Sequence, residues 1–173
     1  MFLLFTGNGK GKTTSAIGQA VRMLGEGKRV LMIQFIKGPW KSGEDESSKL
    51  LHPNFRIIKS GKGFVGILGD KLPREVHRAA ARKGLALAIK EAKSRRWDAL
   101  ILDEVHNAIK LRLLTTKDVL SFVDIALKKL EHLILTGRDA PRALISRADL
   151  VTEMREIKHP YAKGKKAEKG IEY

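Results

Sequence analysis

The chain contains no cysteine, and none of its apolar runs approaches the roughly 20 residues that a membrane-spanning helix needs. The missing cysteine excludes disulfides, thiol catalysis, thiolate metal sites and iron–sulfur clusters. Met1–Phe5 is apolar, but it lacks a basic leader and runs straight into Thr6-Gly7-Asn8-Gly9, so we predict no signal peptide there. These absences predict a cytoplasmic protein and give no reason to expect a membrane partner.

Side-chain amides are scarce too, with only three Asn and two Gln, whereas positive charge is abundant. The 173 residues include 34 Lys and Arg against 19 Asp and Glu, so the formal net charge is +15. This charge suits a nucleic acid, an acidic protein partner or a polyphosphate ligand. A surface rich in Lys, Arg and Glu with few amides also suits heat adaptation. The charge alone therefore identifies no ligand.

Hydrophobic runs alternate with helical stretches along the chain, which is typical of a parallel α/β sheet. The predicted strands are Phe2–Thr6, Val30–Phe35, Phe55–Lys59, Ala99–Leu102, Leu133–Thr136 and Leu150–Ile157. The predicted helices are Lys12–Leu24, Arg74–Arg96, Thr116–Leu130 and Pro141–Arg147. With 43% hydrophobic residues, we expect one domain over residues 1–173, built as a three-layer, doubly wound, mostly parallel sheet.

Three stretches do not follow this alternation. We expect Lys37–Pro53 to form a long loop with at most about one helical turn. Ser60–Pro73 contains four glycines and is predicted to be a second long loop. From about Lys158 the chain continues as a basic tail that ends in Gly-Ile-Glu-Tyr. Whether this tail is ordered stays open at this point.

The strongest local motif is Thr6-Gly7-Asn8-Gly9-Lys10-Gly11-Lys12-Thr13-Thr14, which follows a predicted strand and opens a predicted helix. In this context glycines let backbone N–H groups surround a polyphosphate, and the helix N-terminus adds its dipole. Lys12 would reach the terminal phosphate oxygens, and the Thr13 hydroxyl would hold Mg²⁺. Thr6 stands where the common pattern has its first glycine. The motif predicts a phosphate-binding loop formed by Gly7 to Thr14.

Two further strand ends carry polar residues that suit the same ligand. The predicted strand at Leu100–Leu102 leads into Asp103 and Glu104, at the sheet edge where open α/β folds bind ligands. Beside a phosphate loop, such acids hold the metal ion or orient a water molecule. Arg138 follows another predicted strand and is available to a phosphate. We therefore predict a nucleoside triphosphate with Mg²⁺, or Mn²⁺, on Thr13, Asp103 and Glu104.

Four other side chains are weaker candidates. His106 and Asn107 follow the acidic pair and are candidates for the same cleft, although a histidine there is as often a helix-start residue. We expect Trp40 and Trp97 to be packing anchors rather than stacking platforms.

The order of the motifs resembles the ATP:corrinoid adenosyltransferases of the phosphate-loop type. The resemblance rests on Thr6–Thr14, Gln34–Gly38, Trp40, Gly43, Glu44, Leu102–Glu104, Thr136–Arg138, Ala148–Met154, Lys158-His159, Gly164 and Gly170–Tyr173. It spans nearly the full chain. It implies a recombinase-like phosphate-loop fold that binds ATP and a reduced corrinoid.

The resemblance also implies a reaction, in which a corrinoid reduced to Co(I) attacks the 5′ carbon of ATP and triphosphate leaves. This step belongs to adenosylcobalamin biosynthesis or salvage. Because Co(I) is itself a strong nucleophile, the protein needs no acid, base or nucleophile of its own. It must position two substrates and stabilise an anionic leaving group. The resemblance assigns that stabilisation to Lys12 and Arg138, with Mg²⁺ on Thr13 and Glu104.

Several further expectations depend on the resemblance. Arg22 matches a family arginine near the nucleotide, and Phe64 matches a residue that presents an apolar face to the corrinoid and displaces its lower axial ligand. Some relatives carry a bulky aromatic residue where this chain has Gly66. Relatives can also carry a helix before the first strand, and without it we expect either that Lys37–Pro53 or the basic tail closes the site or that closure is looser. Relatives are homodimers and receive electrons from acidic, flavodoxin-like proteins, which a +15 surface favours.

Two other functions stay open at this point. Asp103-Glu104-Val105-His106 looks like the DExH element of helicases and suggests a nucleic-acid-stimulated NTPase. However, helicases usually bind ATP between two domains, and no aromatic-interleaved strand-binding surface is evident, so we do not expect nucleic acid as the partner. A nucleotide-dependent switch without enzymatic activity would order its two long loops on ATP. It would leave the motifs of the tail unexplained.

Overall fold

The computed structural model describes residues 1–67, 69–160 and 164–171. Its strands are β1 (Phe2–Thr6), β2 (Val30–Gln34), β3 (Phe55–Lys59), β4 (Ala99–Asp103), β5 (His132–Thr136) and β6 (Leu150–Glu153). Its helices are α1 (Lys12–Gly25), α2 (Gly43–Leu50), α3 (Arg74–Lys93), α4 (Val105–Lys110), α5 (Thr116–Ala126) and α6 (Arg142–Ile145). The strands form one sheet in the order β3-β2-β4-β5-β1-β6, and every neighbouring pair is parallel. The predicted parallel sheet is confirmed.

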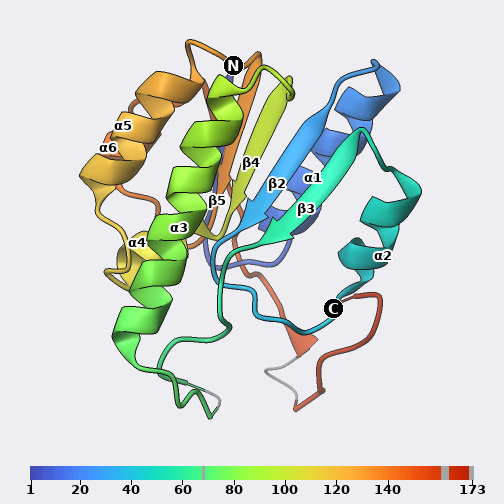
Figure 1. Cartoon of the computed structure of the whole chain (residues 1–173). Coiled ribbons are helices and arrows are strands. Elements are labelled where there is room, and N and C mark those ends of the chain that lie inside the picture. Colours follow the sequence, from blue (N-terminus) through green and yellow to red (C-terminus); the bar gives the residue numbers. More distant parts are fainter. Residues whose placement is uncertain (68, 161–163, 172–173) are drawn as a thin grey trace.

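Helices cover both faces of this sheet (Figure 1). On one face α1 packs through Ala16, Ala20 and Met23, whereas α3, α4, α5 and α6 bury their apolar sides on the other. Residues of β1, β2 and β4 are therefore buried whichever way they point. This explains why these strands are apolar at consecutive positions rather than alternating. The predicted three-layer, doubly wound architecture is confirmed.

The strand order determines where the loops meet. β5 lies between β1, which leads into the phosphate loop, and β4, which leads into the acidic pair. Since all strands are parallel, their carboxyl ends open at the same edge, at the bottom of the sheet in Figure 1. The loops after β1, β4 and β5 therefore lie side by side.

Five elements are shorter than predicted, and three of them end at least three residues early. α3 ends at Lys93 rather than Arg96, α5 at Ala126 rather than Leu130, and β6 at Glu153 rather than Ile157. Arg95 has a φ of 58°, which is incompatible with continuing α3. β6 ends where its neighbour ends, because Glu153 pairs with Thr6, the last residue of β1.

Two helices were not predicted. α2 lies inside Lys37–Pro53, so the prediction of a long loop there is wrong. α2 buries no residue, and its first turn is stabilised by a capping box between Ser42 and Asp45 rather than by an apolar face. The short α4 begins directly after Glu104, whose φ of 60° turns the chain sharply out of β4.

Trp97 is a packing anchor, as predicted. Its side chain is buried, and its indole Nε1–H donates to Glu91 Oε2 at 2.9 Å. Glu91 is also buried and accepts from Arg96 at 2.7 Å, which satisfies its carboxylate. These hydrogen bonds connect the end of α3 to the segment that leads into β4.

The last described residues of the basic tail, Gly170 and Ile171, lie at the carboxyl edge of the sheet, where they share a cavity with residues of α2. Most of the tail is exposed where the structure describes it. In the described part of the chain, no helix is long and apolar enough to cross a membrane. One domain over residues 1–173 stays a prediction.

Two helical glycines differ in their surroundings, and this difference predicts opposite effects of alanine on stability. Gly18 in α1 is exposed, and a Cβ there would meet nothing within 4 Å. Gly84→Ala in α3 would overlap the Ser60 hydroxyl and come within 3.3 Å of Phe35 Cε1. We expect Gly18→Ala to raise the free energy of unfolding by about 0.5–1 kcal/mol. We expect Gly84→Ala to lower it by about 1–3 kcal/mol in urea titrations. Equal effects would contradict the close packing of α3 on the Ser60 segment.

Candidate functional site

A cavity of about 580 Å³ opens at the carboxyl edge of the sheet, where the loops converge. Its walls come from the phosphate loop, α2, the loops after β4 and β5, and the tail. The lining residues are Lys10, Gly11, Lys12, Thr13, Thr14, Ile17, Lys37, Gly43, Glu44, Ser47, Glu104, Asn107, Thr136, Gly137, Arg138, Gly170 and Ile171. The structure thus brings together most of the predicted nucleotide-binding residues, including Lys12 and Arg138.

The first half of the phosphate loop does not line the cavity and instead packs against the backbone after β6. Gly7, Asn8 and Gly9 pass along the segment after β6, where Gly9 N–H donates to the Met154 carbonyl at 2.8 Å. A Cβ on Gly9 would lie 2.7 Å from the Arg155 carbonyl carbon, so only glycine fits there. Gly7 has a φ of 96°, in the region that favours glycine. Backbone packing therefore fixes the shape of the loop.

Asp103 is the buried centre of the site. Its Oδ1 accepts hydrogen bonds from the hydroxyls of Thr13 at 2.9 Å and Thr136 at 2.6 Å, and its Oδ2 accepts from Gln34 Nε2 at 3.1 Å. The side chain has no exposed surface. Burial raises the pKa of Asp103 above its usual value, although the three donors favour the charged form.

Glu104 reaches the cavity because the chain turns at its left-handed backbone. Its N–H donates to Thr136 Oγ1 at 2.9 Å, which holds this turn in place. Burial, together with the neighbouring Asp103 charge, raises the pKa of Glu104 to about 7. A cation bound nearby would lower this pKa and keep Glu104 ionised.

The oxygen atoms of Thr13, Asp103 and Glu104 form a hard donor set of the kind that suits Mg²⁺ or Mn²⁺. The described part of the chain has no group of three or more His, Cys, Asp or Glu side chains arranged for a metal. This fits an ion held by one or two carboxylates, a hydroxyl and ligand phosphates, as Mg²⁺ commonly is.

Positive charge lies close enough to these acids to interact with them. Lys12 Nζ donates to the Gly9 carbonyl at 2.7 Å. Burial, together with the nearby Arg138 charge, lowers the pKa of Lys12. Arg138 is positioned by Asn107, whose Oδ1 accepts from the Arg138 N–H at 2.8 Å. The pocket lining therefore carries four cationic side chains against two carboxylates, which suits a polyanion with a divalent cation.

The two candidates after the acidic pair have different positions. Asn107 lines the cavity, whereas His106 is buried with its Nδ1 3.3 Å from the Gly137 carbonyl oxygen. Burial lowers the pKa of His106 to about 4, so the ring is neutral near pH 7. His106 packs behind the site and does not line this cavity.

A second cavity of about 270 Å³ adjoins the first and is partly aromatic. It is lined by Ile36, Lys37, Gly38, Trp40, Lys41, Ser42, Phe64 and Glu104. The rings of Trp40 and Phe64 lie 5.7 Å apart between centroids, tilted by 32°. Both rings are exposed, Trp40 to 60% and Phe64 to 44%. The two cavities share Lys37 and Glu104.

Trp40 is not the packing anchor that we predicted. Its ring lies against Gly38 and Gly63, where a Cβ on Gly63 would come within 2.6 Å of ring atom Cη2. The two glycines give the ring a flat backbone surface and leave its other side open. Composition alone could not reveal this, because Gly38 and Gly63 come from two different loops.

The structure does not bring Arg22 to the site. Arg22 lies in the last turn of α1, exposed, ten residues beyond Lys12. At the α-helical rise this is about 15 Å along the helix axis. A role for Arg22 in ATP binding stays a prediction that depends on the family resemblance.

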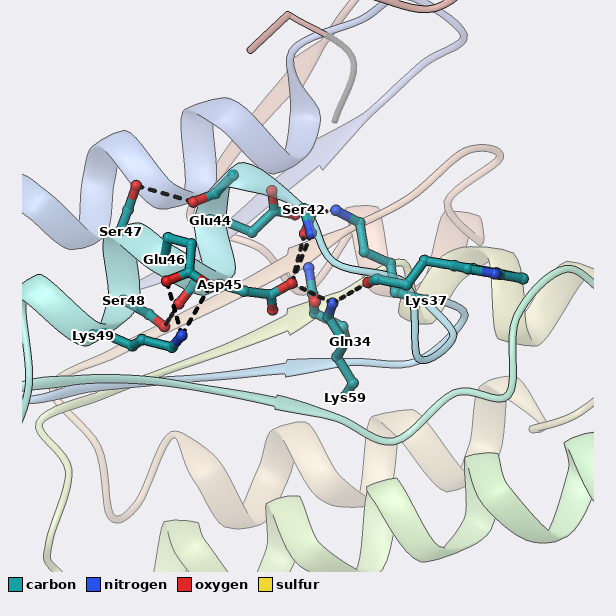
Figure 2. A network of polar contacts seen from close by, with 12 residues as sticks. Gln34, Lys37, Ser42, Glu44, Asp45, Glu46, Ser47, Ser48, Lys49 and Lys59 are labelled. Atoms are coloured by element: carbon teal, nitrogen blue, oxygen red, sulfur yellow. Dashed lines mark hydrogen bonds and ion pairs between the residues drawn. The ribbon is translucent and has the colours of Figure 1, made fainter. Parts of the chain in front are cut away.

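We expected Lys37–Pro53 or the basic tail to close the site, but assigned no role to single residues of α2 or of the tail. Lys37 forms an ion pair with Glu44, within the polar network around the first turn of α2 that Figure 2 shows. Burial acts to raise the pKa of Glu44, but the hydrogen bond and charge of Lys37, together with hydrogen bonds from the backbone and Ser42, hold the pKa below its usual value. Gly170 and Ile171 of the tail close another side of the cavity. These residues lie in segments that carry the family resemblance, and that position is the signal that could have identified them.

Comparison with solved structures agrees with the fold. The flagellar accessory protein FlaH from Methanocaldococcus jannaschii superposes with a TM-score of 0.56, covering 88% of this chain and 69% of that chain. At 13% sequence identity, this likeness concerns the fold alone. It confirms the predicted recombinase-like phosphate-loop architecture.

Comparison of sequences identifies the family. The family model described as ATP:corrinoid adenosyltransferase BtuR/CobO/CobP matches residues 1–173. The corrinoid adenosyltransferase of Escherichia coli (strain K12) is 36% identical over 179 residues, covering 100% of this chain and 85% of the relative. Corrinoid adenosyltransferase CobA of Salmonella typhimurium (strain LT2) is 35% identical over 176 residues, with the same two coverages. The chain therefore belongs to the ATP:corrinoid adenosyltransferase family.

Proposed function

We propose that this protein transfers the 5′-deoxyadenosyl group of ATP to the Co(I) centre of a reduced corrinoid and releases triphosphate. The observation that carries the proposal is the pair of adjoining cavities, one built for a polyphosphate and one lined by aromatic rings, with Lys37 and Glu104 in both. Membership in the family supports it. Both cob(I)yrinic acid a,c-diamide and cob(I)alamin are candidate acceptors.

The chemistry requires no proton transfer. The electron pair of Co(I) forms the bond to C5′ of ATP, while the C5′–O bond breaks and its electron pair leaves on the triphosphate. Negative charge therefore grows on the phosphate chain as the reaction proceeds. Side chains that stabilise this charge more strongly than that of bound ATP accelerate the step.

The residues around the larger cavity suit this task. Lys12, Arg138 and the loop N–H groups would bind the triphosphate, with Lys12 exchanging the Gly9 carbonyl for a phosphate oxygen. Thr13, Asp103 and Glu104 would hold Mg²⁺ or Mn²⁺, which neutralises phosphate charge when bound. The buried, neutral His106 takes no part in this scheme.

The smaller cavity is our proposed corrinoid face. Phe64, supported by Trp40, would present an apolar surface to the lower side of the corrinoid and exclude its axial donor ligand. Losing that donor makes Co(II) easier to reduce. A homodimer, a flavodoxin-type electron donor and a cytoplasmic location complete the proposal. The +15 net charge suits an acidic donor.

The nucleic-acid-stimulated NTPase is not favoured. The DExH-like segment is four residues long, whereas the family match covers residues 1–173. Glu104 and His106 of that segment have positions that the transferase explains, one at the shared wall and one buried behind it.

The proposal is tested by mixing the protein anaerobically with Mg-ATP and chemically reduced cob(I)alamin. We expect a light-sensitive alkylcobalamin, which absorbance detects, and one inorganic triphosphate per corrinoid, which chromatography quantifies. No alkylation of cob(I)alamin or of the incomplete corrinoid would contradict the proposal.

Lys12→Ala should reduce this transfer by at least about 100-fold, because it removes a cation that stabilises the leaving group. Lys129→Ala is the matched control, since it removes the same charge from an exposed position outside both cavities. Near-normal turnover of Lys12→Ala would show that the triphosphate binds elsewhere.

Phe64→Ala should separate two routes to the product. With cob(I)alamin supplied, we expect a modest loss of rate, whereas reduction from cob(II)alamin by a flavodoxin-type donor should fall by about 10-fold or more. Phe64→Leu, which keeps an apolar side chain, should lie between wild type and Phe64→Ala. An equal loss on both routes would contradict a role in removing the axial ligand.

A further inference from the structure

Two lysine–carboxylate pairs connect the sheet to the first turn of α2. Lys59, at the end of β3, donates to Asp45 at 2.6 Å, and Lys37, from the loop after β2, pairs with Glu44. Figure 2 shows both pairs within one network. Asp45 also accepts from the Ser42 N–H at 2.8 Å and so caps the helix. The Lys59–Asp45 pair therefore connects α2 to the sheet edge without involving Lys37 or Glu44.

The Lys37–Glu44 pair differs because both side chains line the larger cavity. They are also more enclosed than most surface pairs, with side-chain exposures of 30% for Lys37 and 14% for Glu44. A carboxylate in the wall of a polyphosphate site opposes ligand binding by like-charge repulsion. Here Glu44 takes up a cation that would otherwise face the ligand.

Lys37 is also the cation that borders both cavities. Its charge acts on the metal-site acids: burial raises the pKa of Asp103 and Glu104, and Lys37 opposes that rise in both. In the proposed reaction, this shared wall is where the 5′ carbon of ATP would meet the corrinoid. An ammonium there would lie close to the bond that breaks.

We propose that Lys37 changes partner from Glu44 to the phosphate chain when ATP binds, and that it stabilises the departing triphosphate. The inference rests on the proposed transferase function for its catalytic part. Glu44 is then the resting counter-ion of Lys37. When Lys37 leaves, Glu44 stays in the first turn of α2, where the helix dipole favours a negative charge. The negative charge of Glu44 is therefore still compensated, by the helix dipole, after Lys37 has changed partner.

The test compares four variants by two measurements. Mg-ATP binding is measured by calorimetry without corrinoid, and kcat and KM for ATP are measured with cob(I)alamin. Lys37→Ala should weaken Mg-ATP binding by about 10-fold and lower kcat by about 100-fold. Lys37→Arg, which keeps the charge, should recover most of both. Glu44→Gln should tighten Mg-ATP binding by roughly fivefold, because it releases Lys37 and removes a repelling charge.

Lys59→Ala is the matched control for ATP binding, since it breaks the neighbouring pair to α2 and Lys59 lines neither cavity, although its Nζ also donates to the Trp40 carbonyl at 2.6 Å. We expect it to lower the melting temperature but leave Mg-ATP binding near wild type. Lys37→Ala behaving like Lys59→Ala, or Glu44→Gln weakening ATP binding, would overturn the exchange. If the wild-type protein transfers no adenosyl group, the proposed function fails, while the calorimetry still decides whether Lys37 and Glu44 exchange partners.

Discussion

The site depends on one buried carboxylate, Asp103. Its two oxygens accept from Thr13 at the start of α1, Thr136 at the end of β5 and Gln34 at the end of β2. Three segments distant in the sequence thus meet β4 at a single side chain. Removing that carboxylate would leave buried donors without acceptors, which typically costs 1–3 kcal/mol for each group. The same hydrogen bonds hold the Thr13 hydroxyl beside the acids, so the contacts that stabilise the sheet edge also preorganise a site for a divalent cation.

Opposite charges meet around this centre. Glu104 lines the larger cavity together with Lys12 and Arg138, and the charge of the buried Asp103 acts on Lys12. A nucleophilic metal centre needs no activated side chain, so the protein's contribution is electrostatic and positional. The aromatic cavity adjoins this charged region through Lys37 and Glu104. This adjacency is what a reaction between an anionic donor and a large, flat acceptor requires.

Much of the fold and of the phosphate-binding site could be predicted from the sequence, because the signals for them are local. Apolar runs placed the strands, and strand–loop–helix order placed Lys12 and Thr13. What could not be predicted depends on long-range contacts: α2 buries no residue and is held by a capping box and by Lys37 and Lys59. Trp40 is exposed because glycines from two loops support its ring. Helical geometry, by contrast, could have shown that Arg22 lies about 15 Å from the loop.

The most direct test of this account is a crystal structure of the protein with Mg-ATP. We expect the triphosphate between the loop and Arg138, Lys37 on a phosphate oxygen, and C5′ at the wall beside Glu104, facing Trp40 and Phe64. With C5′ in that position, a corrinoid in the smaller cavity could reach it. A nucleotide bound with its 5′ carbon directed away from the aromatic cavity, and with Lys37 still paired to Glu44, would contradict the account.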